Sequence, residues 1–123
     1  MASSQPTRQP AKASVSAAAA NSRRPLDMAH LYQQTMGNRA LEIEILDLFC
    51  KQLTSTMASF AKADANERKR LAHALKGTGR SVGAFLLADI AEQIEKSPFD
   101  RTHVANLSAI AIRTCDFAAS VNR

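Results

Sequence analysis

The sequence predicts an all-α protein, an antiparallel four-helix bundle with a short additional N-terminal helix. Apolar residues recur every three or four positions over most of the chain, which is the period of an amphipathic helix. The 123 residues include only four Gly and four Pro, too few turn signals for an all-β fold, and no alternating strand pattern or internal repeat is visible. Short connections between long amphipathic helices favour antiparallel neighbours.

The length and the charge distribution predict one folded domain after a basic tail. A chain of 123 residues that is 46% hydrophobic is sufficient for one core and too short for two sizeable domains. Residues 1–25 hold four basic residues and no acid, whereas residues 26–123 hold twelve basic residues and all eleven acids. We therefore expect a disordered tail over 1–25 and a helical domain over 26–123.

Two other interpretations of the tail are weaker. Its Ser, Ala and Arg content without acids is also typical of organelle transit peptides, but prolines at 6, 10 and 25 interrupt any long amphipathic helix. The tail also lacks the apolar core of a secretory signal, and no apolar run elsewhere approaches the ~20 residues of a membrane span. Nucleic-acid binding by the tail stays a minor alternative, which a strong salt dependence that disappears on deletion of residues 1–25 would support.

The first two predicted helices precede the residue pattern that carries the chemistry. A short helix covers roughly residues 26–36 and ends at Gly37-Asn38. A long helix covers roughly residues 39–62, with a solvated acidic face at Glu42, Glu44 and Asp47. Its apolar stripe is Leu41, Ile45, Phe49, Leu53, Met57 and Phe60.

Three further helices complete the predicted bundle. Asp64 is a candidate N-cap for the third helix, with Glu67 in capping-box spacing, and Gly83 can end that helix in a left-handed conformation. The fourth helix ends at Ser97-Pro98, and Asp100 can cap the fifth. Their apolar positions are Leu87, Ile90 and Ile94 in the fourth helix, and Val104, Leu107, Ile110, Ala111, Cys115 and Phe117 in the fifth.

Several residue types that often carry chemistry are better explained by packing. Cys50 and Cys115 lie 65 positions apart in helical patterns, without a CxxC or zinc-ligand spacing, so we expect buried thiols. We expect His30 and His103 to be partly buried or solvated without a chemical role. We expect Met28, Met36 and Met57 to be packing residues.

The stretch RLAHALKGTGRSVG, residues 70–83, holds three glycines in its last seven residues. A glycine in the interior of a helix destabilises that helix by about 1 kcal/mol relative to alanine. The presence of three glycines in this stretch therefore needs an explanation. The spacing is neither that of a Walker loop nor that of a dinucleotide fingerprint, and both of those follow a strand, whereas a helix precedes these glycines.

A helical wheel at about 100° per residue places one of these glycines, Gly77, beside a histidine. With His73 at zero, the apolar Leu71, Leu75 and Val82 lie opposite, near 180°. Lys69, Lys76, Gly77 and Arg80 lie within about 60° of His73 on its own face. The neighbouring turns contain no carboxylate to orient the ring, and no Ser, Cys or second His that would form a hydrolase or metal site.

This face predicts phosphoryl chemistry. A neutral imidazole is a good nucleophile toward phosphorus, and the cations would stabilise the negative charge of the phosphoramidate product. Gly77, one turn from His73, leaves room for another protein to present the phosphoryl group. We therefore interpret the glycine as a means of access.

At this level of detail the sequence resembles the histidine-containing phosphotransfer (HPt) domain family over roughly residues 26–121. The family core reads AHxLKG, followed by a Gly and a leucine-rich helix that closes in an apolar residue and Glu. An Asp often begins the histidine helix, and a Phe is common in the helix before it. The matching residues here are Phe49, Asp64, Ala72, His73, Leu75, Lys76, Gly77, Gly83, Leu87, Ile94 and Glu95.

The resemblance implies that His73 accepts a phosphoryl group from an aspartyl phosphate and passes it to another aspartate. It implies that Lys76 stabilises the phosphate and that Gly77 admits the partner, and we expect Lys69 and Arg80 to help in docking. One departure is Arg68, at a position that is usually apolar. We expect its side chain to reach outward to solvent from the start of the helix.

The predicted function is that of a phosphorelay carrier and not of an enzyme, because the sequence has no ATP-binding segment. Donor and acceptor would be response-regulator receiver domains, with a hybrid sensor histidine kinase as a further candidate partner. Mg²⁺ would come from the receiver, so we expect no cofactor or metal in this chain. We expect a cytoplasmic monomer. The main alternative is a non-phosphorylated helical adaptor that only docks a receiver or kinase through the His73 face.

Overall fold

A computed structural model describes residues 24–122 and consists, over that range, of five α-helices without a strand. The prediction of an all-helical fold is therefore confirmed for these residues. The tail predicted over 1–25 lies outside the described residues, apart from Arg24 and Pro25. The helices are α2 (Met28–Gln34), α3 (Arg39–Lys62), α4 (Ala65–Val82), α5 (Phe85–Lys96) and α6 (Thr102–Val121).

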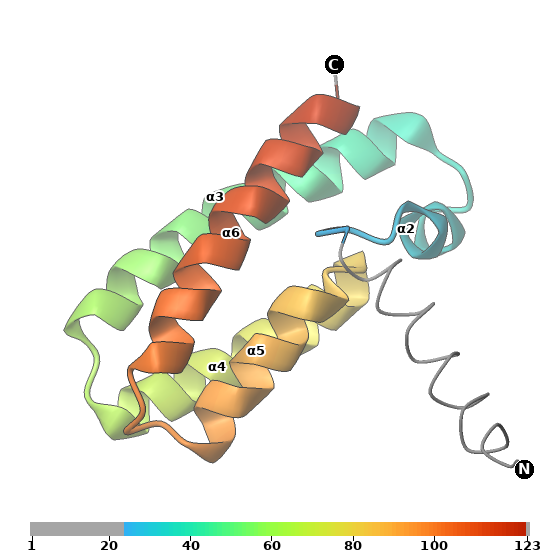
Figure 1. Cartoon of the computed structure of the whole chain (residues 1–123). Coiled ribbons are helices and arrows are strands. Elements are labelled where there is room, and N and C mark those ends of the chain that lie inside the picture. The colour runs from blue at the N-terminus through green and yellow to red at the C-terminus, as the bar shows by residue number, and fades with distance from the viewer. Residues whose placement is uncertain (1–23, 123) are drawn as a thin grey trace, which may run out of the picture.

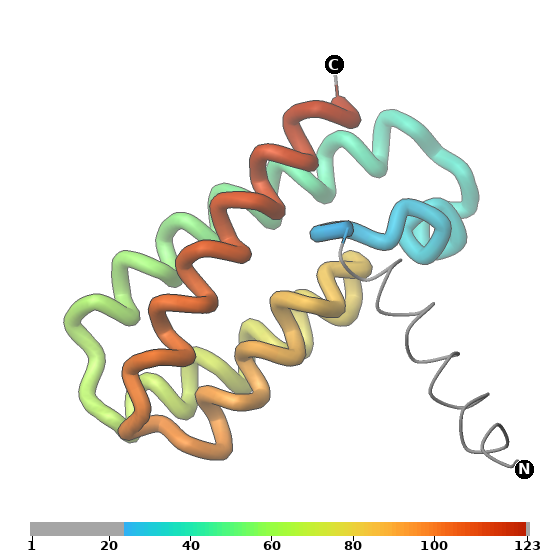
Figure 2. The backbone as a smooth tube through the Cα atoms, in the orientation of Figure 1, coloured from blue at the N-terminus to red at the C-terminus, as the bar shows by residue number. Residues whose placement is uncertain are grey.

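The four long helices enclose the core. In Figure 1, α3 lies beside α6 and α4 lies beside α5, and the tube in Figure 2 shows the chain reversing direction between consecutive long helices. Contacts join α3 to α4, α4 to α5, α5 to α6 and α6 back to α3, so the helices form a closed ring. Leu46, Leu53, Leu87 and Leu107 are buried between them. The short helix α2 lies across one end of the ring and contacts α4.

Side-chain caps set the starts of the first three helices. The carboxylate of Asp27 accepts a hydrogen bond from the backbone N–H of His30, and the amide oxygen of Asn38 accepts one from Leu41. Asp64 caps α4 as predicted, because it accepts from the N–H of Glu67 at 2.8 Å. The Glu67 carboxylate binds the Arg70 guanidinium, so the capping-box spacing here produces a cap and an ion pair.

The end of α4 needs glycine at position 83. Gly83 has φ +90°, and the N–H of Ala84 donates to the carbonyl oxygen of Gly79 at 2.7 Å, which is the closing bond of a Schellman motif. The Gly83 carbonyl accepts from the N–H of Asp27 at 2.9 Å, and a Cβ at Gly83 would lie 2.9 Å from the Asp27 carbonyl oxygen. The predicted helix stop thus also fastens α2 to α4.

The buried stripe of α3 is rotated relative to the predicted one. Phe49, Leu53 and Phe60 are buried as expected, but Leu46 also faces the core and Leu41 is 38% exposed. Glu42 was predicted to be solvated and is buried, where its carboxylate accepts from the Thr35 hydroxyl and binds Arg39. Thr35 lies in the turn that joins α2 to α3, which a wheel of α3 alone does not include, and Arg39 is the first residue of α3.

Arg68 does not reach solvent, contrary to the prediction. Its side chain is buried. Nε donates a hydrogen bond to the carbonyl oxygen of Pro98 at 2.7 Å, and Nη1 donates one to the carbonyl oxygen of Ala63 at 2.8 Å. The guanidinium thus joins the end of α3 and the α5–α6 connection to α4. Hydrogen bonds to two backbone carbonyls are what make burial of this cation tolerable.

One packing expectation also needs correction. Met36 is 92% exposed because it lies in the turn after α2 with φ +54°, whereas Met28 and Met57 pack against the core.

Within the described residues, α6 is long and apolar enough to meet a simple criterion for a membrane span, although no such run was expected. Its Leu107, Ile110 and Ala118 face the core, as in the core helix of a globular protein.

Candidate functional site

Helix α4 holds His73 on its outer face. Ala72, Leu75 and Val82 are buried against the other helices, which leaves the opposite side of α4 toward solvent, as the wheel predicted. The His73 side chain is 70% exposed. The ring is therefore available to a partner while its helix is held by the core.

A carboxylate from α5 orients the ring, although the sequence suggested none. The Oε2 atom of Glu95 lies 2.6 Å from Nδ1 of His73, and Oε1 accepts a hydrogen bond from Nζ of Lys76 at 2.7 Å. Glu95 is 22 residues from His73 along the chain, which is why a search of neighbouring turns missed it. The sequence did contain a signal for Glu95, because the family pattern includes the pair Ile94-Glu95. The resemblance assigned no role to that pair.

Charge and hydrogen bonding keep Glu95 ionised. The hydrogen bond from Lys76 lowers the pKa of Glu95 below its usual value, and the hydrogen bond from His73 lowers it further. An ionised carboxylate only accepts hydrogen bonds, so Nδ1 of His73 carries the proton that the two groups share. The lone pair of the neutral ring is then on Nε2, the nitrogen that does not face Glu95.

The other predicted site residues surround this triad of His73, Lys76 and Glu95. Lys69 lines a shallow depression of about 310 Å³ together with His73, Glu95, Asn66 and Arg70. Arg80, two turns beyond His73, forms an ion pair with Glu92 of α5 at 2.8 Å. Two carboxylates of α5 therefore hold two of the three predicted cations in place, and Lys69 forms no ion pair among residues 24–122.

The glycines of α4 fall into two classes. A Cβ at Gly77 would meet no atom within 4 Å, so position 77 is open space on the surface. A Cβ at Gly79 would lie 3.3 Å from the Ala84 carbonyl oxygen and 3.3 Å from Leu87 Cδ2. Gly79 thus allows α5 to pack closely against α4, whereas the fold has no steric need for glycine at 77.

The two remaining histidines have structural partners. The Nε2 atom of His30 lies 3.2 Å from the Ser81 carbonyl oxygen, and its ring packs edge-on against Phe85. His103 lies 3.6 Å from the Asp100 carboxylate and is partly buried. Neither lies in the depression beside His73.

No group of three or more His, Cys, Asp or Glu side chains between residues 24 and 122 is placed to hold a metal ion. The polar groups that line the depression are an imidazole, a carboxylate, an amide and two basic side chains. Such a set can present a nucleophilic nitrogen and attract an anion.

Comparison with known proteins yields one family. The Hpt domain family matches residues 27–115, which contain α2 to α5 and most of α6. No curated protein and no solved structure matches the chain. Hpt domains are phosphotransfer carriers of two-component signalling, not kinases, and they interact with response-regulator receiver domains and kinases. With its matched residues spanning most of the chain, this protein belongs to the Hpt domain family.

Proposed function

We propose that this protein carries a phosphoryl group on Nε2 of His73 between aspartates of receiver domains in a multistep phosphorelay. The observation that carries the proposal is the hydrogen bond between Nδ1 of His73 and the Glu95 carboxylate, on a ring that is 70% exposed. That bond selects the tautomer with an outward lone pair, which is the form that attacks phosphorus.

The transfer follows from this tautomer. Nε2 of His73 attacks the phosphorus of an aspartyl phosphate, the N–P bond forms, and the O–P bond to the aspartate breaks. The proton stays on Nδ1, so the ring becomes positively charged while it holds the phosphoryl group. The Glu95 carboxylate stabilises that charge, in the way that a carboxylate stabilises an imidazolium in hydrolases. The reverse attack by a second aspartate completes the relay.

Cations beside the ring neutralise the phosphoryl oxygens. Lys76 is the stabilising group that we assign by the family pattern, and its ion pair with Glu95 holds the ammonium group near the ring. Lys69 lines the depression beside His73 and is placed to add a second positive charge. Mg²⁺ would be supplied by the acidic pocket of the receiver.

The docking face consists of Lys69, Gly77 and Arg80 around His73. Gly77 presents no side chain where the receiver would approach, and the two cations would attract its acidic pocket. The four long helices act as an antiparallel bundle that holds this face rigid, with α2 as an additional helix. We place the protein in the cytoplasm as a monomer, with receiver domains and a hybrid sensor kinase as partners.

His73→Gln tests the proposal, with His103→Gln as the matched control. Both variants should remain folded because neither ring lies in the core. After mixing with a phosphorylated receiver, wild type and His103→Gln should gain acid-labile phosphate and His73→Gln should gain none. Phosphate on His73→Gln would identify another acceptor. A wild-type protein that binds the receiver but never gains phosphate would be an adaptor, and the proposal would be wrong.

A further inference from the structure

Two cysteine thiols lie between helices α3 and α6. Cys50 of α3 and Cys115 of α6 line the same small cavity of about 120 Å³, and both are partly buried. Six of the seven residues that line this cavity belong to α3 or α6, and the seventh, Asn122, is the C-cap of α6. Helices α4 and α5 therefore contribute no residue to it. The Cys50 and Cys115 thiols lie within hydrogen-bonding reach of each other.

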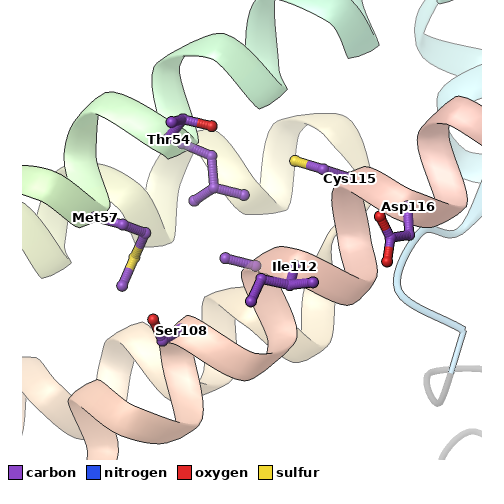
Figure 3. A pocket seen from close by; sticks show the side chains of 8 residues that line it. Thr54, Met57, Ser108, Ile112, Cys115 and Asp116 are labelled. Atoms are coloured by element: carbon purple, nitrogen blue, oxygen red, sulfur yellow. The ribbon is translucent and has the colours of Figure 1, made fainter.

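Cys115 is also accessible from a second opening. It lines a groove of about 310 Å³ between α3 and α6, together with Met57, Ser108 and Ile112. Figure 3 shows the side chains of Met57 and Thr54 on α3 facing those of Ser108, Ile112 and Cys115 on α6. The groove is open to solvent and wide enough for a small oxidant to reach the Cys115 sulfur.

Burial raises the pKa of both thiols. Burial, the hydrogen bond to Cys115 and the charge of Asp47 raise the pKa of Cys50 to about 12. Burial and the nearby Asp116 also raise the pKa of Cys115, but the hydrogen bond with Cys50 opposes that rise. Both thiols are therefore weak acids, and access decides the order of oxidation: Cys115 lines the open groove and Cys50 does not, so an oxidant reaches Cys115 first.

We propose that Cys50 and Cys115 form a reversible intramolecular disulfide that links α3 to α6. Hydrogen peroxide oxidises the Cys115 thiol to a sulfenic acid, its O–O bond breaks, and one water is released. The Cys50 sulfur then attacks the Cys115 sulfur, the S–S bond forms, the S–O bond breaks, and a second water leaves. Two thiols and one peroxide thus yield one disulfide and two waters, and a dithiol reductant reverses the change.

The bond would restrain the helix pair without touching the phosphoryl site. The two cysteines lie 65 positions apart, so the disulfide would close a long loop of the unfolded chain and stabilise the fold. His73, Lys76 and Glu95 all belong to α4 and α5. Oxidised protein should therefore keep its ability to accept a phosphoryl group while its resistance to unfolding increases.

Mass spectrometry of the intact, purified protein after treatment with hydrogen peroxide tests the disulfide directly. Wild type should lose about 2 Da, the mass of two hydrogens, and stay monomeric on a non-reducing gel. Its melting temperature should rise by roughly 10 °C and return after reduction. A wild-type product that only gains oxygen, or that links two chains together, would overturn the proposal.

Serine variants test the order of the two steps. With Cys50→Ser the Cys115 sulfenic acid has no thiol to attack it, so a sulfenic-acid probe such as dimedone should label the protein. With Cys115→Ser labelling of Cys50 should be at least about tenfold lower, because Cys50 does not line the open groove. Equal labelling of both variants, or stronger labelling of Cys115→Ser, would overturn the assignment of Cys115 as the residue that is oxidised first.

Discussion

Glu95 of α5 and His73 of α4 share a proton across a distance of 2.6 Å between Oε2 and Nδ1. The same carboxylate binds the ammonium group of Lys76 through its other oxygen. One side chain from a neighbouring helix therefore sets the orientation of the ring and the position of the adjacent cation. Glu95 belongs to α5, so α5 as well as α4 contributes to the proposed chemistry.

Replacement of Glu95 should impair transfer without unfolding the protein. We expect Glu95→Ala to lower the rate of phosphoryl transfer from a receiver by about 10–100-fold, because the ring loses its orienting acceptor. Glu95→Gln should retain more activity than Glu95→Ala, since the amide oxygen still accepts the hydrogen bond from Nδ1. Radiolabelled phosphate in a rapid-mixing assay measures both rates.

Glu92 offers a matched control on the same helix. It binds Arg80 and Lys96 and makes no contact with His73. Glu92→Ala should therefore transfer within about threefold of wild type. Equal losses in the Glu92 and Glu95 variants would mean that the charge of α5 matters and the orientation of the ring does not.

The Glu95 interactions should contribute stability only while the carboxylate is ionised. Lys76 first and His73 second lower the pKa of Glu95 in the folded protein below the usual value of 4.5. Stability from this group is therefore fully present above about pH 4.5, the value expected in the unfolded chain, and is lost as the pH falls through the lower folded value. Melting temperatures of wild type and Glu95→Gln should differ at pH 7, and the difference should shrink as the pH falls below about 4.5. A difference that persists undiminished at low pH would contradict this assignment.

Lys76→Ala should slow transfer by about tenfold and shorten the life of the phosphorylated form, because one cation near the phosphoryl oxygens is removed. The variant should stay folded, because the Lys76–Glu95 ion pair is only partly buried, with each side chain 20% exposed. Lys51→Ala is the control, because Lys51 pairs with Asp47 on α3. Unchanged kinetics in both directions of transfer would exclude Lys76 from the site.

Glutamine at Gly77 and at Gly79 should have opposite effects on stability. Gly77→Gln should raise the melting temperature, because glutamine is the better helix former by up to about 1 kcal/mol and its Cβ meets no atom. Gly79→Gln should lower it, because its Cβ would press on the Ala84 carbonyl and Leu87.

Transfer assays on the same preparations separate access from folding. Gly77→Gln should bind the receiver more weakly and transfer more slowly, although it is more stable than wild type. Such a combination cannot arise from a folding defect. A Gly77→Gln protein that transfers normally would mean that the receiver docks elsewhere on the surface.

Arg68→Met should destabilise the protein by about 2 kcal/mol or more while leaving the docking face intact. The substitution keeps much of the side-chain volume but removes the donors to the carbonyl oxygens of Ala63 and Pro98. Urea denaturation measures the loss, and Arg70→Met is the control because Arg70 is exposed and pairs only with Glu67 in the described structure. Similar stability of both variants would show that the carbonyls find other partners.

Local signals predicted the helices because helix formation depends on near neighbours. The predicted limits of residues 39–62, the cap at Asp64 and the stop at Gly83 all agree with the structure. The wheel also predicted correctly that His73 lies opposite the buried Leu75 and Val82. Each of these features is set by residues within a few positions along the chain.

Contacts between helices could not be predicted in the same way. The wheel of α3 did not indicate that Glu42 is buried, because Thr35 lies outside that helix. The expectation that Arg68 reaches solvent was wrong because its two acceptors lie outside α4, in the turn before that helix and in the α5–α6 connection. The meeting of Cys50 with Cys115 depends on the packing of α3 against α6.

The sequence by itself thus determined the helical fold, the position of His73 on an exposed helix face, and the identity of the cations and the glycine around it. Only the tertiary structure decided which carboxylate orients the ring, since Glu95 reaches His73 by the packing of α5 against α4. Helical periodicity specifies the direction of each side chain relative to its own axis, but not the rotation and height of one helix against another. Those are set by the packing of the whole core, including Gly79, which allows α5 to approach α4 closely.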